Sequence, residues 1–162
     1  MTRILFVCLG NICRSPAAEN IMRHLVEQAN LSGHIQCDSA GTSNYHPGEP
    51  PDRRMQKVLQ QRGIPVQGTA RQIQRSDFEH FDLILAMDRE NLSDICALDL
   101  KGVYRHKVKL MGSYCRDPRF QNREVPDPYY GGEAIFHEVV DMLKDGCQAL
   151  LEELVMPTPA GY

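Results

Sequence analysis

Short apolar runs alternate along this chain with longer segments in which apolar residues recur every three or four positions. Residues 3–7 form a short, partly β-branched apolar run, which is typical of a buried strand in a parallel sheet. Comparable runs at residues 34–37, 82–87 and 105–110 predict three further strands. The chain is therefore expected to supply four strands.

The intervening segments show helical spacing. Ser15 is expected to cap the first helix and Pro16 to begin it. Residues 51–62, 88–97 and 132–155 predict three more helices. The expected core face of the last helix consists of Ile135, Phe136, Val139, Val140, Leu143, Cys147, Leu150, Leu151 and Leu154.

Alternating strands and helices indicate an α/β fold with right-handed crossovers, in which ligands bind beyond the carboxyl ends of the strands. The small residues at 38–42 predict a turn, and residues 111–130 a long irregular loop of the kind that is usually functional. We expect one domain over residues 1–156 and a short flexible tail over 157–162.

Composition excludes several classes of protein. The chain has 162 residues, 42% of them hydrophobic and 24% charged, and its net charge is −3. This composition predicts a globular protein and, with no basic block, argues against nucleic acid as a partner. The apolar runs are too short for membrane insertion and no signal region precedes the first strand, so we expect a soluble, cytoplasmic protein.

Six cysteines and six dispersed histidines form neither a disulfide framework nor a zinc-binding pattern. The first loop also lacks a Walker lysine motif. We therefore expect no metal and no cofactor.

The segment from Cys8 to Ser15 joins the first strand to the first helix. Free N–H groups and the positive helix end at such a turn can hold a phosphate-like dianion. Arg14 adds a planar fork of donors for two phosphate oxygens, and Gly10 permits a left-handed or close-approach backbone. The same surroundings favour Cys8 as a nucleophilic thiolate, to which Ser15 can donate its hydroxyl.

Two alternatives apply to this loop. A buried cysteine at the end of a strand is commonly a small apolar filler, although Cys8 in register with Gly10, Arg14 and Ser15 argues against that interpretation. Asn11 either braces the loop by bonding to its carbonyls or is an ordinary turn residue.

Asp127 is the candidate proton donor for a leaving oxygen, a role that contributes about 10²–10⁴-fold to a rate. Prolines on both sides stiffen its backbone on the long loop. Tyr129, Tyr130 and Tyr45 could form aromatic walls that select a flat phenyl phosphate. The alternatives are a turn aspartate and half-buried loop aromatics.

These motifs together resemble the low-molecular-weight protein tyrosine phosphatases. The resemblance covers residues 3–155 and is carried by Val7–Pro16 as the C-x5-R-S loop, Asp127-Pro128-Tyr129-Tyr130, Asp38–Thr42, Ala70-Arg71-Gln72 and Met87-Asp88-x-x-Asn91. It implies a flavodoxin-like three-layer fold, a four-stranded parallel sheet with helices on both faces. It further implies hydrolysis of phosphotyrosine and aryl phosphates, tyrosine-phosphorylated proteins as substrates, and inhibition by inorganic phosphate or other oxyanions.

The resemblance also implies a role for each site residue. Cys8 would form the phosphocysteine intermediate, Arg14 would clamp the phosphoryl group, and Asp127 would act as acid and then as base. Residues that bind phosphate, support the loop or shape the mouth would be Leu9, Gly10, Asn11, Ile12, Cys13, Ser15, Tyr45, Tyr129 and Tyr130.

Cys13 matches a second loop cysteine that can form a disulfide with Cys8, which would protect Cys8 from irreversible oxidation. It could instead be a tight-space filler. The sequence departs from much of the family in two places. Gly68 and Thr69 precede Ala70, where the family often has a histidine that braces the loop asparagine, and the mouth carries Tyr45 and His46 where some relatives have tryptophan.

Three other functions compete with this interpretation. Arsenate reduction on the same fold would need two further closely placed cysteines in its thioredoxin-coupled form, and a glutathione-linked form stays open. A phosphocysteine phosphocarrier would have no clear use for Asp127. A phosphopeptide-binding module would not need the thiol of Cys8.

Overall fold

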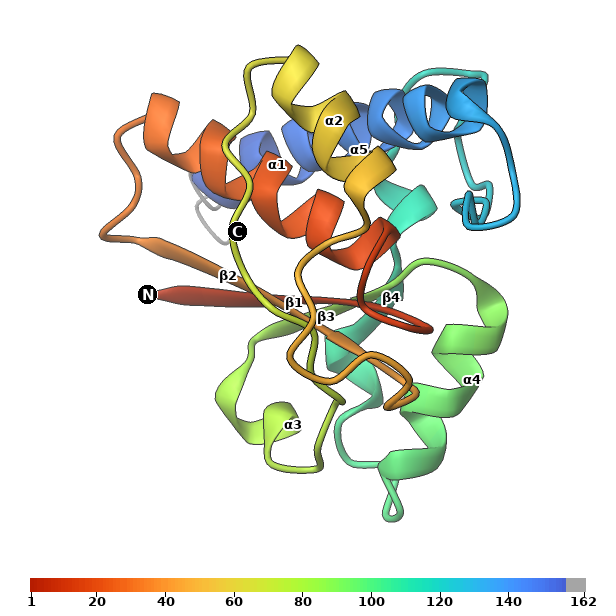
Figure 1. Cartoon of the computed structure of the whole chain (residues 1–162). Helices are drawn as coiled ribbons and strands as arrows, with labels where there is room; N and C mark the ends of the chain where they lie inside the picture. Colours follow the sequence, from red (N-terminus) through yellow and green to blue (C-terminus); the bar gives the residue numbers. More distant parts are fainter. Residues whose placement is uncertain (157–162) are drawn as a thin grey trace.

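Four parallel strands form one sheet in the computed structural model, which describes residues 1–156 (Figure 1). They are β1 (Thr2–Cys8), β2 (Ile35–Gly41), β3 (Leu83–Ala86) and β4 (Val108–Leu110), in the order β2-β1-β3-β4 across the sheet. Each neighbouring pair is parallel. The four-stranded parallel sheet expected from the sequence is confirmed.

Helices cover both faces of this sheet. On one face lie α1 (Arg14–Gln28), α2 (Arg53–Gln61) and α5 (Glu133–Val155), and on the other lie α3 (Asp77–His80) and α4 (Arg89–Leu98) (Figure 1). Separate groups of buried apolar residues fill the two interfaces between helices and sheet. This is the three-layer, flavodoxin-like arrangement that the sequence predicts.

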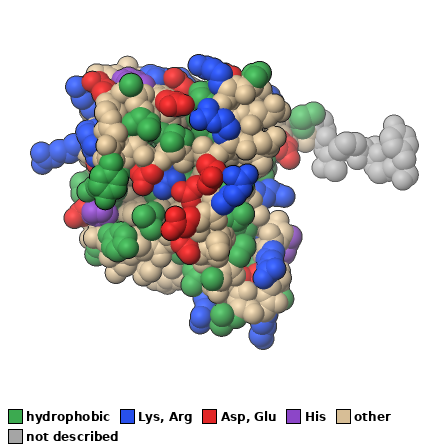
Figure 2. All heavy atoms as spheres, turned by 90° about the vertical axis from the view of Figure 1, so that its right-hand side faces the viewer, with side chains coloured by type: hydrophobic (Ala, Val, Ile, Leu, Met, Phe, Trp, Pro, Cys, Tyr) green, Lys and Arg blue, Asp and Glu red, His purple; other side chains and the backbone are tan. Residues whose placement is uncertain are grey.

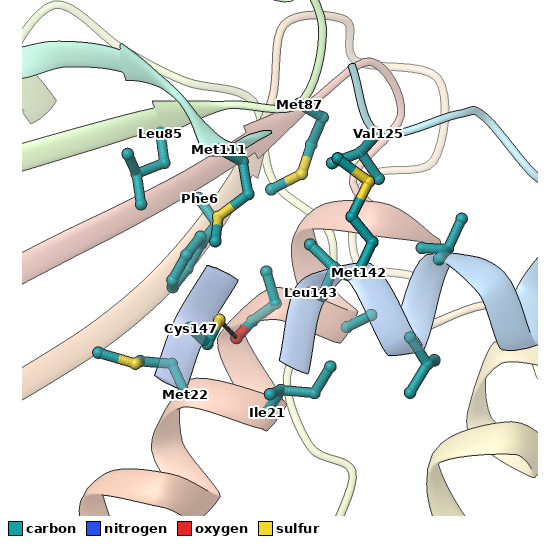
Figure 3. Packing of buried hydrophobic residues seen from close by; sticks show 14 of the residues in the cluster. Phe6, Ile21, Met22, Leu85, Met87, Met111, Val125, Met142, Leu143 and Cys147 are labelled. Atoms are coloured by element: carbon teal, nitrogen blue, oxygen red, sulfur yellow. Dashed lines mark hydrogen bonds between the residues drawn. The ribbon is translucent and has the colours of Figure 1, made fainter. Parts of the chain in front are cut away.

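The larger core lies between the sheet and the α1–α5 helix pair. Figure 3 shows Phe6 and Leu85 of the sheet facing Ile21 and Met22 of α1 and Leu143 of α5. All five side chains are almost fully buried. Because burial of one such side chain contributes about 1.5–3 kcal/mol, this layer is a main source of the fold's stability.

The predicted turn at residues 38–42 is wrong, because residues 38–41 continue β2. This strand pairs with β1 along its whole length, from Thr2 opposite Ile35 to Cys8 opposite Gly41. A Cβ atom at Gly41 would lie 2.6 Å from the carbonyl oxygen of Leu9. The small residues that suggested a turn are therefore needed where β2 passes against the loop after Cys8.

The expected start of the first helix is also wrong. Helix α1 begins at Arg14, and Cys13 occupies the cap position without a side-chain capping bond. Ser15 does not cap the helix because its hydroxyl lies against the sulfur of Cys8 instead.

Smaller differences occur elsewhere. The predicted strand at 105–110 divides into a short 3₁₀ helix (Arg105–Lys107) and β4, and a second 3₁₀ turn (Met111–Tyr114) begins the long loop. The four-residue helix α3 was not predicted, since it is too short to show a helical period. The flexible tail predicted at residues 157–162 lies outside the described residues, and a single domain over 1–156 stays a prediction.

The strand order places the loops after β1 and β3 side by side. The chain leaves β1 in one direction to form β2 and later crosses to the opposite side of β1 to form β3. The backbone N–H of Met87, just after β3, donates to the carbonyl of Val7 at 3.2 Å. Such a switch point at the carboxyl edge of a sheet is where ligands bind in open α/β folds.

Candidate active site

The sulfur of Cys8 lies at the bottom of the loop that follows β1. Cys8 is the last residue of the strand and is buried, and its Sγ lies 2.9 Å from Oγ of Ser15. The side chain of Cys8 therefore lines the cavity described below, next to the hydroxyl of Ser15. It also packs at the edge of the hydrophobic core.

The loop's carbonyl groups are hydrogen-bonded to the surrounding structure. The oxygens of Cys8 and Leu9 accept from the backbone N–H groups of Thr42 and Ser43 at 2.9 and 3.0 Å. That of Ile12 accepts from Asp52 at 2.8 Å. Within residues 1–156, by contrast, the N–H groups of residues 9–13 have no protein acceptor. The loop therefore presents unpaired donors beside the start of α1, an arrangement suited to an anion.

Asn11 fixes the shape of this loop. It has a φ of 56°, in the left-handed region, whereas Gly10 does not. The left-handed conformation considered for Gly10 is thus found one residue later. The close approach at Gly10 is present, because a Cβ atom there would lie 3.3 Å from the ring of His46.

The side chain of Asn11 bonds to hydroxyls and a backbone N–H rather than to the loop's carbonyls, which corrects that expectation. Its Nδ2 donates to Oγ of Ser15 at 2.8 Å and to Oγ of Ser39 at 2.9 Å. Its Oδ1 accepts from the backbone N–H of Arg71 at 3.0 Å. Asn11 is supported here although Gly68 stands where a histidine was expected.

Arg14 is buried and held on one side by two acceptors. Its Nη1 donates to Oδ2 of Asp88 at 2.7 Å and to the carbonyl of Val125 at 3.1 Å. Burial acts to lower the pKa of Arg14, but Cys8, Asp88 and Asp127 outweigh burial and raise it. Arg14 therefore stays charged at any working pH.

Asp127 lies across the cavity from the loop. Its Oδ2 is 3.8 Å from Nη2 of Arg14, and its side chain is 43% exposed. Two residues earlier, the N–H of Val125 donates to the carbonyl of Met87 at 2.9 Å, while the Val125 carbonyl accepts from Arg14. Val125 thus joins the segment that carries Asp127 to Met87, just after β3, and to Arg14 at the start of α1.

These groups surround a cavity of about 310 Å³ at the carboxyl edge of the sheet. Figure 2 shows this face, where acidic side chains gather near the middle and hydrophobic and basic ones border them. Attraction for an anion must therefore come from the loop and Arg14 rather than from the surrounding surface. The cavity is lined by Cys8, Leu9, Gly10, Ile12, Cys13, Arg14, Tyr45, His46, Asp127, Tyr129 and Tyr130.

Comparison with known proteins identifies the family of the chain. The model of the family described as low molecular weight phosphotyrosine protein phosphatase matches residues 3–158. The chain belongs to this family. A Synechocystis protein, named provisionally as a low molecular weight protein-tyrosine-phosphatase, is 58% identical over 94% of this chain and 96% of its own.

Solved structures resemble this family member closely. A protein tyrosine phosphatase from Entamoeba histolytica, crystallised with Hepes in its active site, has a TM-score of 0.87 and 44% identity over 95% of this chain and 97% of its own. An arginine phosphatase from Drosophila has a TM-score of 0.86 and 34% identity over 98% of this chain and 100% of its own.

The structure brings ten of the twelve sequence-predicted residues of this family member to the cavity wall. Asn11 and Ser15 are the two that do not line it, and both lie buried behind the loop. His46 also lines the wall, beside Tyr45, although it was not predicted as a site residue.

Three further residues support the site and were not predicted as site residues. Asp88 binds Arg14, as described above. Behind Asn11, Oγ of Ser39 donates to Oε1 of the buried Glu19 at 2.6 Å. Asp88 and Ser39 both follow predicted strands at the edge where ligands bind, whereas Glu19 had no signal.

Cys13 differs chemically from a surface thiol. Burial raises the pKa of Cys13, and the charges of Asp52 and Cys8 raise it further. Cys13 is therefore a neutral thiol at physiological pH.

Two further features concern membrane proteins and metalloproteins. Over residues 1–156, no helix is both long and apolar enough to cross a membrane. In the same part of the chain, no group of three or more His, Cys, Asp or Glu side chains is arranged to hold a metal ion.

Proposed function

We propose that this chain hydrolyses phosphotyrosine and aryl phosphate monoesters through a cysteinyl-phosphate intermediate, without a metal ion. The observation that supports this most strongly is the set of unpaired loop N–H groups around Cys8, with Arg14 beside them and Asp127 opposite. Nucleophile, anion site and proton donor then share one cavity.

In the first step the thiolate of Cys8 attacks phosphorus. A sulfur–phosphorus bond forms while the bond from phosphorus to the phenol oxygen breaks, and Asp127 gives its proton to that oxygen. The loop N–H groups and Arg14 bind the equatorial oxygens, on which negative charge is spread in the transition state.

In the second step water replaces sulfur at phosphorus. The Asp127 carboxylate takes a proton from the water as its oxygen attacks, and the sulfur–phosphorus bond breaks. Phosphate leaves, Cys8 returns to a thiolate, and Asp127 is again protonated for the next cycle.

Ser15 assists both steps by donating a hydrogen bond to sulfur. Its oxygen accepts from Nδ2 of Asn11, so its own proton is directed to Sγ of Cys8 at 2.9 Å or to the carbonyl of Ala40 at 3.3 Å. The donated bond stabilises negative charge on sulfur, both as nucleophile and as leaving group.

The aromatic rim supports phosphotyrosine as the substrate. The rings of Tyr129 and Tyr130 lie edge to face with centroids 4.9 Å apart, and Tyr45 lines the cavity with them. Such walls favour a flat phenol ring over a short alkyl chain. Tyrosine-phosphorylated proteins are therefore the proposed substrates, and inorganic phosphate and related oxyanions the proposed inhibitors.

A substrate panel tests this proposal. Peptides of one sequence carrying phosphotyrosine, phosphoserine or phosphoarginine are compared by phosphate release, with and without a chelator such as EDTA. We expect the phosphotyrosine peptide to have a kcat/KM at least about 10²-fold above the others, because only it fills the aromatic cavity, and EDTA to change nothing. Preference for phosphoarginine, or loss of activity with EDTA, would contradict the proposal.

The positions of the other thiols do not favour arsenate reduction. Cys115 and Cys147 are 3% and 0% exposed and pack in the core, outside the cavity lining. The position of Asp127 across from Arg14 likewise supports hydrolysis over a phosphocarrier, which would not need a general acid.

We also propose a reversible oxidation at this site. Hydrogen peroxide oxidises the Cys8 thiolate to a sulfenic acid and is itself reduced to water. The sulfur of Cys13 then attacks the sulfur of Cys8, a disulfide forms and a second water leaves. Two equivalents of a reducing thiol restore both residues. The two side chains line the same cavity, which supports the pairing.

Recovery from peroxide tests this role. After inactivation and treatment with dithiothreitol, the wild type is expected to regain most of its activity and Cys13→Ser only a small part, because Cys8 then oxidises further. Cys37→Ser, at a thiol that lines a different cavity, should recover like the wild type. Equal recovery of Cys13→Ser and the wild type would remove Cys13 from this role.

A further inference from the structure

We propose that Arg54 is a positioning residue that holds the segment of Asp127 against the Cys8 loop. Arg54 does not line the cavity, but its contacts connect the two segments that carry the reaction. The proposal rests on the function proposed above and assigns to α2 a role in it.

The guanidinium of Arg54 is fixed by an acidic partner and by aromatic rings. Its Nε and Nη2 donate to Oδ1 and Oδ2 of Asp52 at 3.1 and 3.0 Å. Its Cζ lies 4.7 Å from the ring centroid of Phe136 and 5.5 Å from that of Tyr129. A cation held over an aromatic face in this way is attracted to it, and the planar guanidinium suits this contact.

On one side this arrangement is joined to the loop of the nucleophile. The backbone N–H of Asp52 donates to the carbonyl of Ile12 at 2.8 Å. Asp52 also caps α2, since its Oδ1 accepts from the backbone N–H of Arg54 at 2.8 Å. The first turn of α2 is therefore held against the Cys8 loop independently of the contacts between Arg54 and the aromatic rings.

On the other side it is joined to the proton donor. The backbone N–H of Tyr129 donates to Oδ1 of Asp127 at 3.1 Å. Upstream of Asp127, Val125 is held by Met87 and Arg14, as described above. Arg54 and the ring of Tyr129 supply the restraint on the downstream side. Loss of Arg54 would remove this restraint and leave the turn closed by Gly131 and Pro128, followed by the start of α5, as the downstream connection.

The test exploits the difference between good and poor leaving groups. Phenyl phosphate needs a general acid, whereas 4-nitrophenyl phosphate releases a more stable anion and needs it less. Arg54→Gln is expected to lower kcat/KM about tenfold for phenyl phosphate and less than about twofold for 4-nitrophenyl phosphate, because kcat/KM reports the first step alone, in which Asp127 acts as the acid. Arg53→Gln, which removes an equal charge from an exposed neighbour, should match the wild type.

A double variant separates positioning from a merely structural effect. If Arg54 acts through Asp127, the Arg54→Gln change should cost nothing further in an Asp127→Ala background. Equal losses on both substrates, losses that multiply in the double variant, or the same losses in Arg53→Gln would each overturn the proposal. A failure of the proposed function looks different: Asp127→Ala alone would then show no leaving-group dependence.

Discussion

Replacing Cys8 with serine is expected to lower kcat for aryl phosphates by about 10⁴-fold or more, because the other cysteine that lines the cavity, Cys13, is a neutral thiol whose pKa is raised by burial. The change removes one polarisable atom and keeps a hydrogen-bonding group beside Ser15, so the fold should be preserved. The rate of phenol release under saturating substrate measures the effect. Rapid-quench mass spectrometry should detect a phosphoryl group on Cys8 in the wild type alone.

Cys96→Ser is the matched control, since this half-buried thiol lies on α4 and does not line the cavity. Its kcat should equal that of the wild type. Wild-type turnover by Cys8→Ser would mean that the nucleophile is another group, and the proposed mechanism would fail with it.

Replacing Asp127 with alanine is expected to lower kcat for phenyl phosphate by about 10²–10⁴-fold, which is the range for loss of a general acid. The loss should be much smaller with 4-nitrophenyl phosphate when formation of the intermediate limits the rate. The wild type should show a bell-shaped dependence of kcat/KM on pH, since one group must be ionised and another protonated. The variant should lack the alkaline limb of this profile.

Asp117→Ala controls for loss of a carboxylate from the same long loop. The side chain of Asp117 bonds to Arg119 at 2.8 Å, away from the cavity, so this variant should keep both the rate and the pH profile. If kcat/KM of Asp127→Ala falls by the same factor with both leaving groups, Asp127 does not protonate the leaving oxygen in the first step.

Local pattern predicted much of the fold. The apolar runs at residues 3–7 and 82–87 fall within or around β1 and β3, and the apolar face expected for the last helix is buried except at Ile135 and Leu154, which are half-buried. Strand boundaries were less predictable where they depended on a neighbour. Gly41 taken alone is typical of a turn. It belongs to β2 because it pairs with Cys8 of β1, and the carbonyl of Leu9 leaves no room there for a side chain.

Most of the cavity residues were predicted because they lie in two short motifs, whereas the residues behind them were not. Asp88 comes 74 positions after Arg14, and Ser39 reaches Asn11 across 28 positions. Neither pair has a local signal, because folding alone brings the partners together. The left-handed backbone at Asn11 depends in the same way on the three bonds that its side chain makes.

The guanidinium of Arg14 is already in position before a ligand binds, and this preorganisation has a consequence for turnover. The group is buried and held by Asp88 and Val125, so its rotamer entropy is lost during folding and not when a ligand arrives. A preorganised fork discriminates poorly between a phosphoryl group still attached to a substrate and the free phosphate that leaves. Retention of the product is therefore the natural cost of this rigidity, and turnover would slow as phosphate accumulates.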